Sequence, residues 1–452
     1  MNLNKVPAVR NAFLALASIA LIIAVFAATF ERSRQRDLRP SDDNIWFYMT
    51  GAELRNPASA ETVRNIVLND VIPRTASEEG AKRFIMRVEY NENYYAHSVL
   101  LGLVNPPADT AARNGVLPYA DAISEGTLNV TAVAAIISLT LLIAGLVVTR
   151  RAYFLTAAAF AMVILALAPL FSSAGNFILF ESLDPAIFGV NLVRFLINPG
   201  EQFLIFGFTP RNYMFLLTLV VFAWRWAGMW AASYWFAAAL LIVHLSLGAL
   251  FIAILVAIDL LLRREQFLRL HIVAPLAFAA VFWAGRESLW EYLTPSLKVV
   301  MPVLVGLFAL VALIGFQILG RRLRNHPLMT SVPKLLQPLQ KQPSYLSDAA
   351  IISVGWLVLL PITYAISASM DPVVAKYFWA QLNARLYARL YPAIVFAIML
   401  WAFHKYALKL DQRPWIAPLA CGAVAIAFLL QAPRAAEPYA KFREGMRIVA
   451  QA

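Results

Sequence analysis

Long uncharged apolar runs constrain this chain more than any other feature of its sequence. An α-helix needs about 20 mostly apolar residues to cross the hydrocarbon core of a bilayer. Of the 452 residues, 61% are hydrophobic and only 14% are charged, whereas a soluble domain carries roughly 25% charged residues. The sequence therefore predicts an all-α fold, a polytopic membrane helical bundle that forms a single integral membrane domain over residues 1–452. About eleven predicted spans lie at 13–30, 130–148, 152–171, 213–228, 229–246, 247–262, 272–285, 299–320, 350–370, 391–408 and 414–432.

The distribution of charge predicts the orientation of these spans. Lys and Arg collect in the cytoplasmic connections of membrane proteins. With a cytoplasmic N-terminus, the connections on the cytoplasmic side are all basic, namely 149–151, Arg225, 262–269, the segment from 320 and 404–413. The opposite side then receives nearly all the acidic residues. Because this topology accounts for the net charge of +12, no nucleic-acid partner is expected.

The first apolar run, 13–30, follows Lys5 and Arg10 as the core of a signal peptide would. No small-residue cleavage site comes before the charged stretch E-R-S-R-Q-R, so we expect a retained first helix. The one cysteine, Cys421, lies inside an apolar run. A disulfide framework and a thiolate metal site are therefore both excluded.

Three connections are long enough to have structure of their own. The first extracytoplasmic loop, 31–129, contains two stretches with helical apolar spacing, at 95–104 and after Pro118. The second, 172–212, is semi-apolar and interrupted by prolines, which suits helices that lie along the membrane surface. Residues 321–349 form a basic cytoplasmic linker.

The motifs of nucleotide-dependent and zinc enzymes do not occur in the sequence. It has no phosphate-binding glycine loop, zincin motif or G-x-S-x-G elbow, so no nucleotide cofactor is expected. Of the five histidines, only His97 and His244 fall on the extracytoplasmic side of the predicted topology. A histidine-rich metal centre is not favoured.

A pair of carboxylates, Asp42 and Asp43, follows the first predicted span and precedes the aromatic stretch N-I-W-F-Y. In one interpretation the pair caps a helix, because negative charge is stabilised at the positive end of the helix dipole. In the other, a carboxylate fixed just outside the bilayer takes the proton of a hydroxyl nucleophile as general base. The two interpretations are compatible.

The stretch S-D-D-N-I-W-F-Y-M-T-G-A-E-L, 41–54, resembles the segment after the first transmembrane helix in GT-C type membrane glycosyltransferases. The order of segments is similar too, with a first helix, a long first outer loop with short helices, and about eleven spans. Two further patches are similar to bacterial members, F-G-F-T-P-R-N at 206–212 and L-I-V-H-L-S-L-G at 241–248.

The resemblance implies an enzyme of the bacterial cytoplasmic (inner) membrane that takes part in cell-envelope synthesis. It would move a sugar, with inversion, from a polyprenyl-phosphate-linked donor to an envelope lipid or polysaccharide acceptor on the extracytoplasmic face. By the same resemblance Asp43 or Asp42 is the general base, and Asp43 is preferred because it directly precedes the aromatic stretch. The second outer loop contains Glu181, Asp184 and Glu201 but lacks the acidic motif typical of the family. The resemblance therefore does not decide whether a divalent cation is a cofactor.

The leaving group of such a transfer is a lipid phosphate, which requires cations at the depth of the headgroups. Arg211 at the outer start of one span and His244 near the outer end of the next are the first candidates. Arg385 and Arg389 are four residues apart and enter another span from the same side. The alternatives are an arginine that extends to the interface and a histidine packed in a core.

Two weaker candidates for substrate binding are His97, in the polar and aromatic stretch 90–97, and Glu201. The expected partners of the chain are the lipid-linked donor and membrane lipids. Three other functions fit the same sequence: an O-antigen ligase or polymerase, a transporter without covalent chemistry, and a component of an envelope assembly. Charges inside the spans would favour the transporter. Asp259 is such a residue, and it lies close to the basic residues on the cytoplasmic side.

Overall fold

The computed structural model describes about half of the chain. The described residues are 95–104, 116–150, 156–164, 211–264, 270–284, 336–368 and 388–411, with single positions between 12 and 27, at 154, between 300 and 318, and between 413 and 423. Within these ranges every regular element is a helix and none is a strand, which confirms the all-α prediction for this part of the chain. Asp42, Asp43, Glu201 and Arg385 lie outside the described residues.

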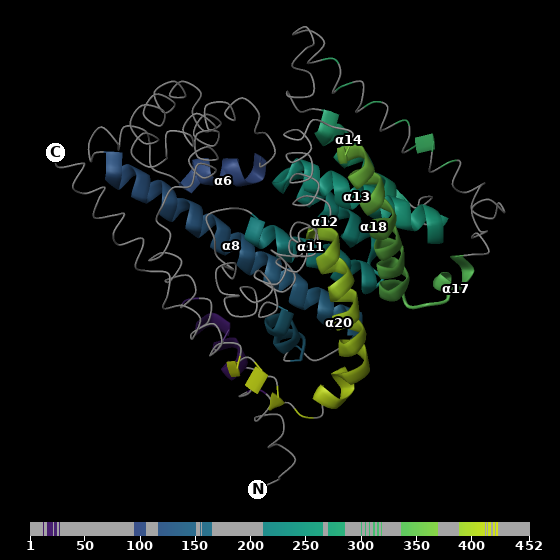
Figure 1. The fold of residues 1–452 in the computed structure, drawn as a ribbon. Coiled ribbons are helices and arrows are strands. Elements are labelled where there is room, and N and C mark those ends of the chain that lie inside the picture. The colour runs from purple at the N-terminus through teal and green to yellow at the C-terminus, as the bar shows by residue number, and fades with distance from the viewer. Residues whose placement is uncertain are drawn as a thin grey trace.

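Nine helices carry labels in Figure 1. They are α6 (Tyr95–Val104), α8 (Val116–Arg150), α11 (Arg211–Trp226), α12 (Trp230–Val243), α13 (Leu245–Leu262), α14 (Leu270–Ala284), α17 (Gln337–Gln340), α18 (Ser344–Ala368) and α20 (Ala388–Asp411). Each of the eleven predicted spans contains helical positions in the described part of the chain. One helix segment, Asn129–Val148, is long and apolar enough to cross a membrane, and α11, α12, α13 and α20 contain shorter apolar segments.

The longest of the labelled helices, α8, runs diagonally in the view of Figure 1 and packs against α11 and α6. Its 35 residues extend for about 52 Å at 1.5 Å per residue. The sequence predicted a separate short helix after Pro118, but the structure continues one helix from Val116 to Arg150. Pro118 does not interrupt it because a proline is tolerated in the first turn, where its missing N–H would have had no helical acceptor.

Two tight turns fold α11, α12 and α13 back on one another. Gly228, with φ of +81°, ends α11 in a Schellman-type cap, in which the Gly228 amide donates to the Arg225 carbonyl and the Met229 amide to the Trp224 carbonyl, both at 3.0 Å. His244 is the single extended residue between α12 and α13. The predicted boundaries in this part of the chain were therefore correct to within about three residues.

The second turn depends on Gly248. A Cβ at this position would lie 2.2 Å from the backbone Cα and N atoms of Leu241, on the helix that comes before the turn. Only a residue without a side chain permits this approach. The position of His244 between the two helices is therefore tied to the glycine four residues later.

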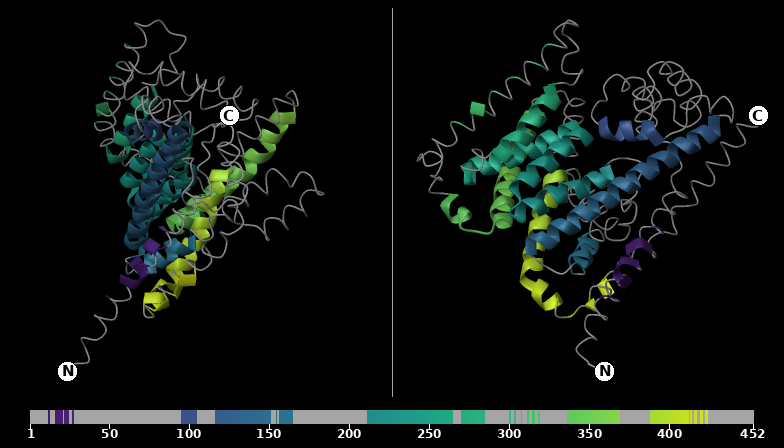
Figure 2. Two further views of the ribbon diagram at one scale, coloured as in Figure 1. Left: turned by 90° about the vertical axis from the view of Figure 1, so that its left-hand side faces the viewer. Right: turned by 180° about the vertical axis from the view of Figure 1, so that it is seen from behind.

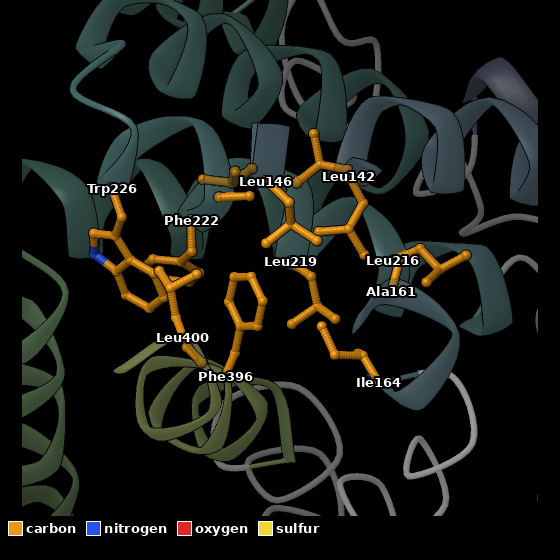
Figure 3. Close-up of a cluster of buried hydrophobic side chains, with 14 of the residues drawn as sticks. Leu142, Leu146, Ala161, Ile164, Leu216, Leu219, Phe222, Trp226, Phe396 and Leu400 are labelled. Carbon is orange, nitrogen blue, oxygen red and sulfur yellow. The ribbon is translucent and has the colours of Figure 1, made fainter. Parts of the chain in front are cut away.

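The apolar core joins α8, α11, α20 and the helical residues 156–164. Figure 3 shows that aliphatic side chains of α8 and α11 meet aromatic and aliphatic side chains of α20, and Trp226 stacks on Phe396 with ring centroids 5.5 Å apart. Near its end α8 passes close to α11, since a Cβ on Gly145 would lie 3.1 Å from the Ala223 Cβ. In the view turned by 90°, α18 and α20 slant across the other helices (Figure 2).

The helix α18 begins at Ser344, six residues before the predicted span 350–370. Ser347 and Asp348, at the end of the predicted linker 321–349, are the fourth and fifth residues of α18. Both side chains are buried. The helix can include them because arginines close to other helices compensate the charge of Asp348.

Candidate functional site

The predicted lipid-phosphate residues are described to different extents. Arg211 is the first residue of α11, Arg389 the second residue of α20 and His97 the third residue of α6, and the structure describes their places on the helix backbone. The side chain of His244 is buried between α12 and α13. The helix that carries His97 packs against α8 and α12.

Arg211 and His244 come to the same end of one helical hairpin. Because α11 and α12 pack side by side and are joined by the short turn at Gly228, they run antiparallel. Arg211 begins α11 and His244 ends α12, so both lie at the end of the hairpin opposite this turn. We call this the Arg211–His244 end. The structure thus brings together the helix positions of the first two candidate residues.

The opposite end of the hairpin contains a group of charged side chains that the sequence did not predict as a unit. We call this group the charge cluster, and it consists of Arg225, Tyr234, Asp259, Arg263 and Asp348. Arg225, Tyr234, Asp259 and Asp348 are 0% exposed, and the side chain of Arg263 is 16% exposed. Two arginines face two aspartates, so the cluster is neutral overall.

Four helices bring the charge cluster together. Arg225 lies in the last turn of α11, Tyr234 near the start of α12 and Asp259 in the last turn of α13. Arg263 directly follows α13, and Asp348 is the fifth residue of α18. The end of α11, the start of α12, the end of α13 and the start of α18 therefore meet at one place (Figure 1).

Asp259 binds the guanidinium of Arg225 with both carboxylate oxygens. The Nη1 of Arg225 donates to Oδ2 at 3.1 Å, and Nη2 donates to Oδ1. The hydroxyl of Tyr234 donates to the same Oδ2 at 2.9 Å. This two-point pairing is the geometry in which arginine and carboxylate interact most strongly.

Asp348 connects α18 to the other helices. Its Oδ2 accepts from the Nε of Arg225 at 2.6 Å and from the indole Nε1 of Trp226 at 3.0 Å. Its Oδ1 accepts from the Nη1 of Arg263 at 2.8 Å. The Nη2 of Arg263 also donates to the Ser347 hydroxyl at 2.9 Å. All four carboxylate oxygens of the cluster thus accept a hydrogen bond.

A tryptophan covers the two guanidinium groups. The Cζ atoms of Arg225 and Arg263 lie 4.7 and 4.8 Å from the centroid of the Trp230 ring. The aromatic face is the electronegative part of the indole, so it attracts both cations. The positive charges of the cluster are therefore stabilised by carboxylates and by an aromatic ring.

The chemistry of the charge cluster is that of a closed ionic network. Both carboxylates are occupied by guanidinium groups, and among the described residues no group of three or more His, Cys, Asp or Glu side chains could hold a metal ion. Buried ion pairs require this kind of full hydrogen bonding to compensate for lost hydration. Glu181, Asp184 and Glu201, the acidic residues of the second outer loop, lie outside the described residues.

Arg225 was predicted to belong to a cytoplasmic connection, and the structure places it in the last turn of α11. Arg225 is fully buried, because Asp259 and Asp348 supply the opposite charges. One signal was present in the sequence. Acidic and basic residues occur within about a turn of the predicted cytoplasmic ends of several apolar runs, where they can pair between helices.

The chain was compared with known proteins at three levels. No protein-family model, no curated protein and no solved structure matches it.

Proposed function

We propose that the chain is a polytopic membrane protein of the bacterial inner membrane. The support is a set of large apolar side chains that remain exposed on the folded helices, at a density that water-soluble proteins avoid. On α18 they are Val354, Leu357, Val358 and Ile362, and between 300 and 318 they are Val300, Val303, Leu307, Val311, Ile314 and Ile318. Both sets consist of helical residues in the described part of the chain whose large apolar side chains are exposed. Such exposed apolar side chains are suited to contact with the acyl chains of lipids.

The charge cluster is consistent with this proposal. Charged side chains within a membrane pair with one another and face the interior of the protein. The four charged members of the cluster do so, and they lie where apolar helices begin or end. In the predicted topology all of these helix ends are on the cytoplasmic side.

We further propose that the protein is a glycosyltransferase of the GT-C type, with its active site on the extracytoplasmic face. The proposal rests on the resemblance of residues 41–54 and on one structural observation, the Arg211–His244 end. This end lies across the hairpin from the charge cluster, which is the position that a lipid-phosphate site on the outer face requires. Arg211 can donate two parallel hydrogen bonds to a phosphate, and a protonated His244 can add a third.

The proposed reaction is a single displacement at the anomeric carbon of the donor sugar. The acceptor hydroxyl oxygen forms the new bond to this carbon, and the bond from the carbon to the phosphate oxygen breaks. Asp43, or Asp42, accepts the hydroxyl proton as general base. The bonding electrons leave with the polyprenyl phosphate, whose negative charge Arg211 and His244 stabilise.

Thermal unfolding of the purified protein in detergent, with and without a polyprenyl monophosphate, tests the phosphate site. A ligand that binds only the folded state stabilises it by about 2.7 kcal/mol at a hundred times its dissociation constant. We expect a higher unfolding temperature for the wild type and no change for Arg211→Ala. Arg413→Ala, which removes an exposed arginine elsewhere, is the matched control and should keep the ligand effect. An equal ligand effect in Arg211→Ala would rule out this site.

The catalytic assignment is tested separately. Asp43→Asn keeps the size of the side chain and removes its basicity, so transfer of sugar to the acceptor should be lost while expression and unfolding temperature stay unchanged. Asp42→Asn is the neighbouring control and should retain turnover. If both variants transfer sugar at the wild-type rate, neither aspartate is the general base.

A transporter without covalent chemistry is the second candidate, and the charge cluster is the observation that favours it. Buried charges between helices occur in proteins that move ions or polar substrates. In that case Asp259→Asn would abolish transport in proteoliposomes, whereas a glycosyltransferase carrying this substitution would keep its sugar transfer once folded.

A further inference from the structure

The start of α18 contains several buried side chains. Tyr345, Ser347, Asp348, Ala349 and Ile352 are buried, whereas Val354, Leu357, Val358 and Ile362 further along the helix are exposed. The helix packs mainly against α20, and its contacts with α11 and α13 are fewer. The hydrogen bonds that join α18 to the ends of these two helices come from Ser347 and Asp348, close to its start.

Side-chain hydrogen bonds supplement the apolar packing of Tyr345, Ala349 and Ile352 at this start. Asp348 accepts hydrogen bonds from Arg225, Trp226 and Arg263, and Ser347 accepts a fourth from Arg263. The accompanying ring contact is the edge-on approach of Tyr345 to Trp226, with centroids 6.5 Å apart. A polar contact of this kind has a defined geometry and is lost when a single charge is removed, unlike a broad apolar interface.

We propose that the charge cluster is a conformational joint. Asp348 fixes the start of α18 to the ends of α11 and α13, and removal of its charge releases α18 from these helices while its packing on α20 is retained. Asp259 holds Arg225 in position within the hairpin but does not itself contact α18, so its role in the joint differs from that of Asp348. This inference holds whichever of the functions above is correct.

The experiment is a distance measurement by pulsed electron paramagnetic resonance on the full chain in detergent. The one native cysteine is first replaced, as Cys421→Ser. Spin labels are then attached to cysteines at Leu260 on α13 and Leu357 on α18, both of which are exposed. Asp348→Asn keeps the shape of the side chain and removes its charge. We expect one narrow distance in the unsubstituted background, and a second, longer distance in Asp348→Asn.

Two controls make the result specific. In Asp348→Asn, a label pair on Leu357 and Ile398 should keep its distance, because it measures α18 against α20. Asp259→Asn is the same change at the other aspartate of the cluster, and it should leave the distance between Leu260 and Leu357 unchanged. A longer distance in both aspartate variants would contradict the proposal, since it would mean general loosening of the fold.

A milder variant covers the case in which Asp348→Asn does not fold. Arg263→Gln combined with Ser347→Ala removes two hydrogen bonds of α18 at the more exposed side of the cluster and leaves the bond between Asp348 and Arg225. The longer distance should then appear in a smaller share of molecules. An unchanged distance in whichever of the two variants folds would overturn the joint.

Discussion

The two ends of the hairpin formed by α11 and α12 differ in which helices supply their charged and titratable residues. At the charge cluster, Arg225 meets two aspartates from helices distant in the sequence, and the whole set is neutral and buried. At the Arg211–His244 end, an arginine and a histidine come from the two helices of one hairpin. The first arrangement joins helices that are distant in the sequence, whereas the second is the place at which we propose a lipid-phosphate site. A charged residue near the end of an apolar helix can therefore be a structural ion pair, and its burial alone does not identify a functional residue.

The largest effect should come from breaking the charge balance at the cluster. Asp348→Leu leaves Arg225 buried with one carboxylate instead of two and removes the shorter of the two ion pairs of Arg263. Loss of one member of a buried ion pair typically costs about 3–5 kcal/mol. We expect the free energy of unfolding, measured by denaturant titration in detergent, to fall by about this amount.

An uncharged replacement of the four charged residues of the cluster is the counterpart of this variant. It combines the substitutions Arg225→Met, Asp259→Leu, Arg263→Gln and Asp348→Leu. Because it leaves no buried charge, it should recover most of the lost stability. If Asp348→Leu has the same free energy of unfolding as the wild type, the charge cluster does not hold the helices together, and the contrast with the Arg211–His244 end is lost.

Tyr234→Phe should have an intermediate effect. It removes one hydrogen-bond donor to Asp259 and leaves both salt bridges of Arg225 in place. Hydrogen bonds to charged groups contribute roughly 1.5–3 kcal/mol, so the same unfolding measurement should show a decrease within this range. Ligand binding at the Arg211–His244 end should be unaffected. A loss of polyprenyl phosphate binding in Tyr234→Phe would mean that the two ends are coupled.

Gly248→Ala should disturb the Arg211–His244 end and leave the charge cluster intact. The added Cβ would overlap the backbone of Leu241, and overpacking of this kind costs about 1–3 kcal/mol. The turn at His244 must then open, so we expect the stabilisation by polyprenyl monophosphate to be reduced together with the unfolding temperature.

Gly355→Ala is the matched control for this substitution. A Cβ at Gly355, inside α18, meets no atom within 4 Å, so the variant should be neutral or gain up to about 1 kcal/mol from helix propensity. Equal unfolding temperatures for Gly248→Ala and Gly355→Ala would contradict the inference that the turn at His244 has no room for a Cβ at position 248.

The positions of the helices could be predicted from the sequence because apolar runs bounded by charge, glycine and proline are local signals. Gly228 correctly predicted the turn between α11 and α12, and residues 95–104 form the predicted short helix. The structure differs from the prediction in two places. The stretch after Pro118 and the span 130–148 form one helix, and α18 begins six residues before the predicted span 350–370.

The charge cluster could not be predicted because its pairs are distant in the sequence. Arg225 is 123 residues from Asp348 and 34 from Asp259. Each residue alone resembled an ordinary charge at the edge of an apolar run, and only the three-dimensional packing of the helices decides which charges meet. The Arg211–His244 end was easier to anticipate, since its two residues belong to consecutive helices joined by a short turn.

The order in which the cluster is completed follows from its positions along the chain. Arg225, Asp259 and Arg263 are synthesised well before Asp348, which comes 89 residues after Asp259 (348 − 259). At roughly 5–20 residues per second, synthesis of these residues takes about 4–18 s. During that interval the nascent protein has two arginines of the cluster and one of its two aspartates. Arrival of Asp348 therefore neutralises the cluster, so that the start of α18 completes a charge balance that the earlier helices leave unfinished.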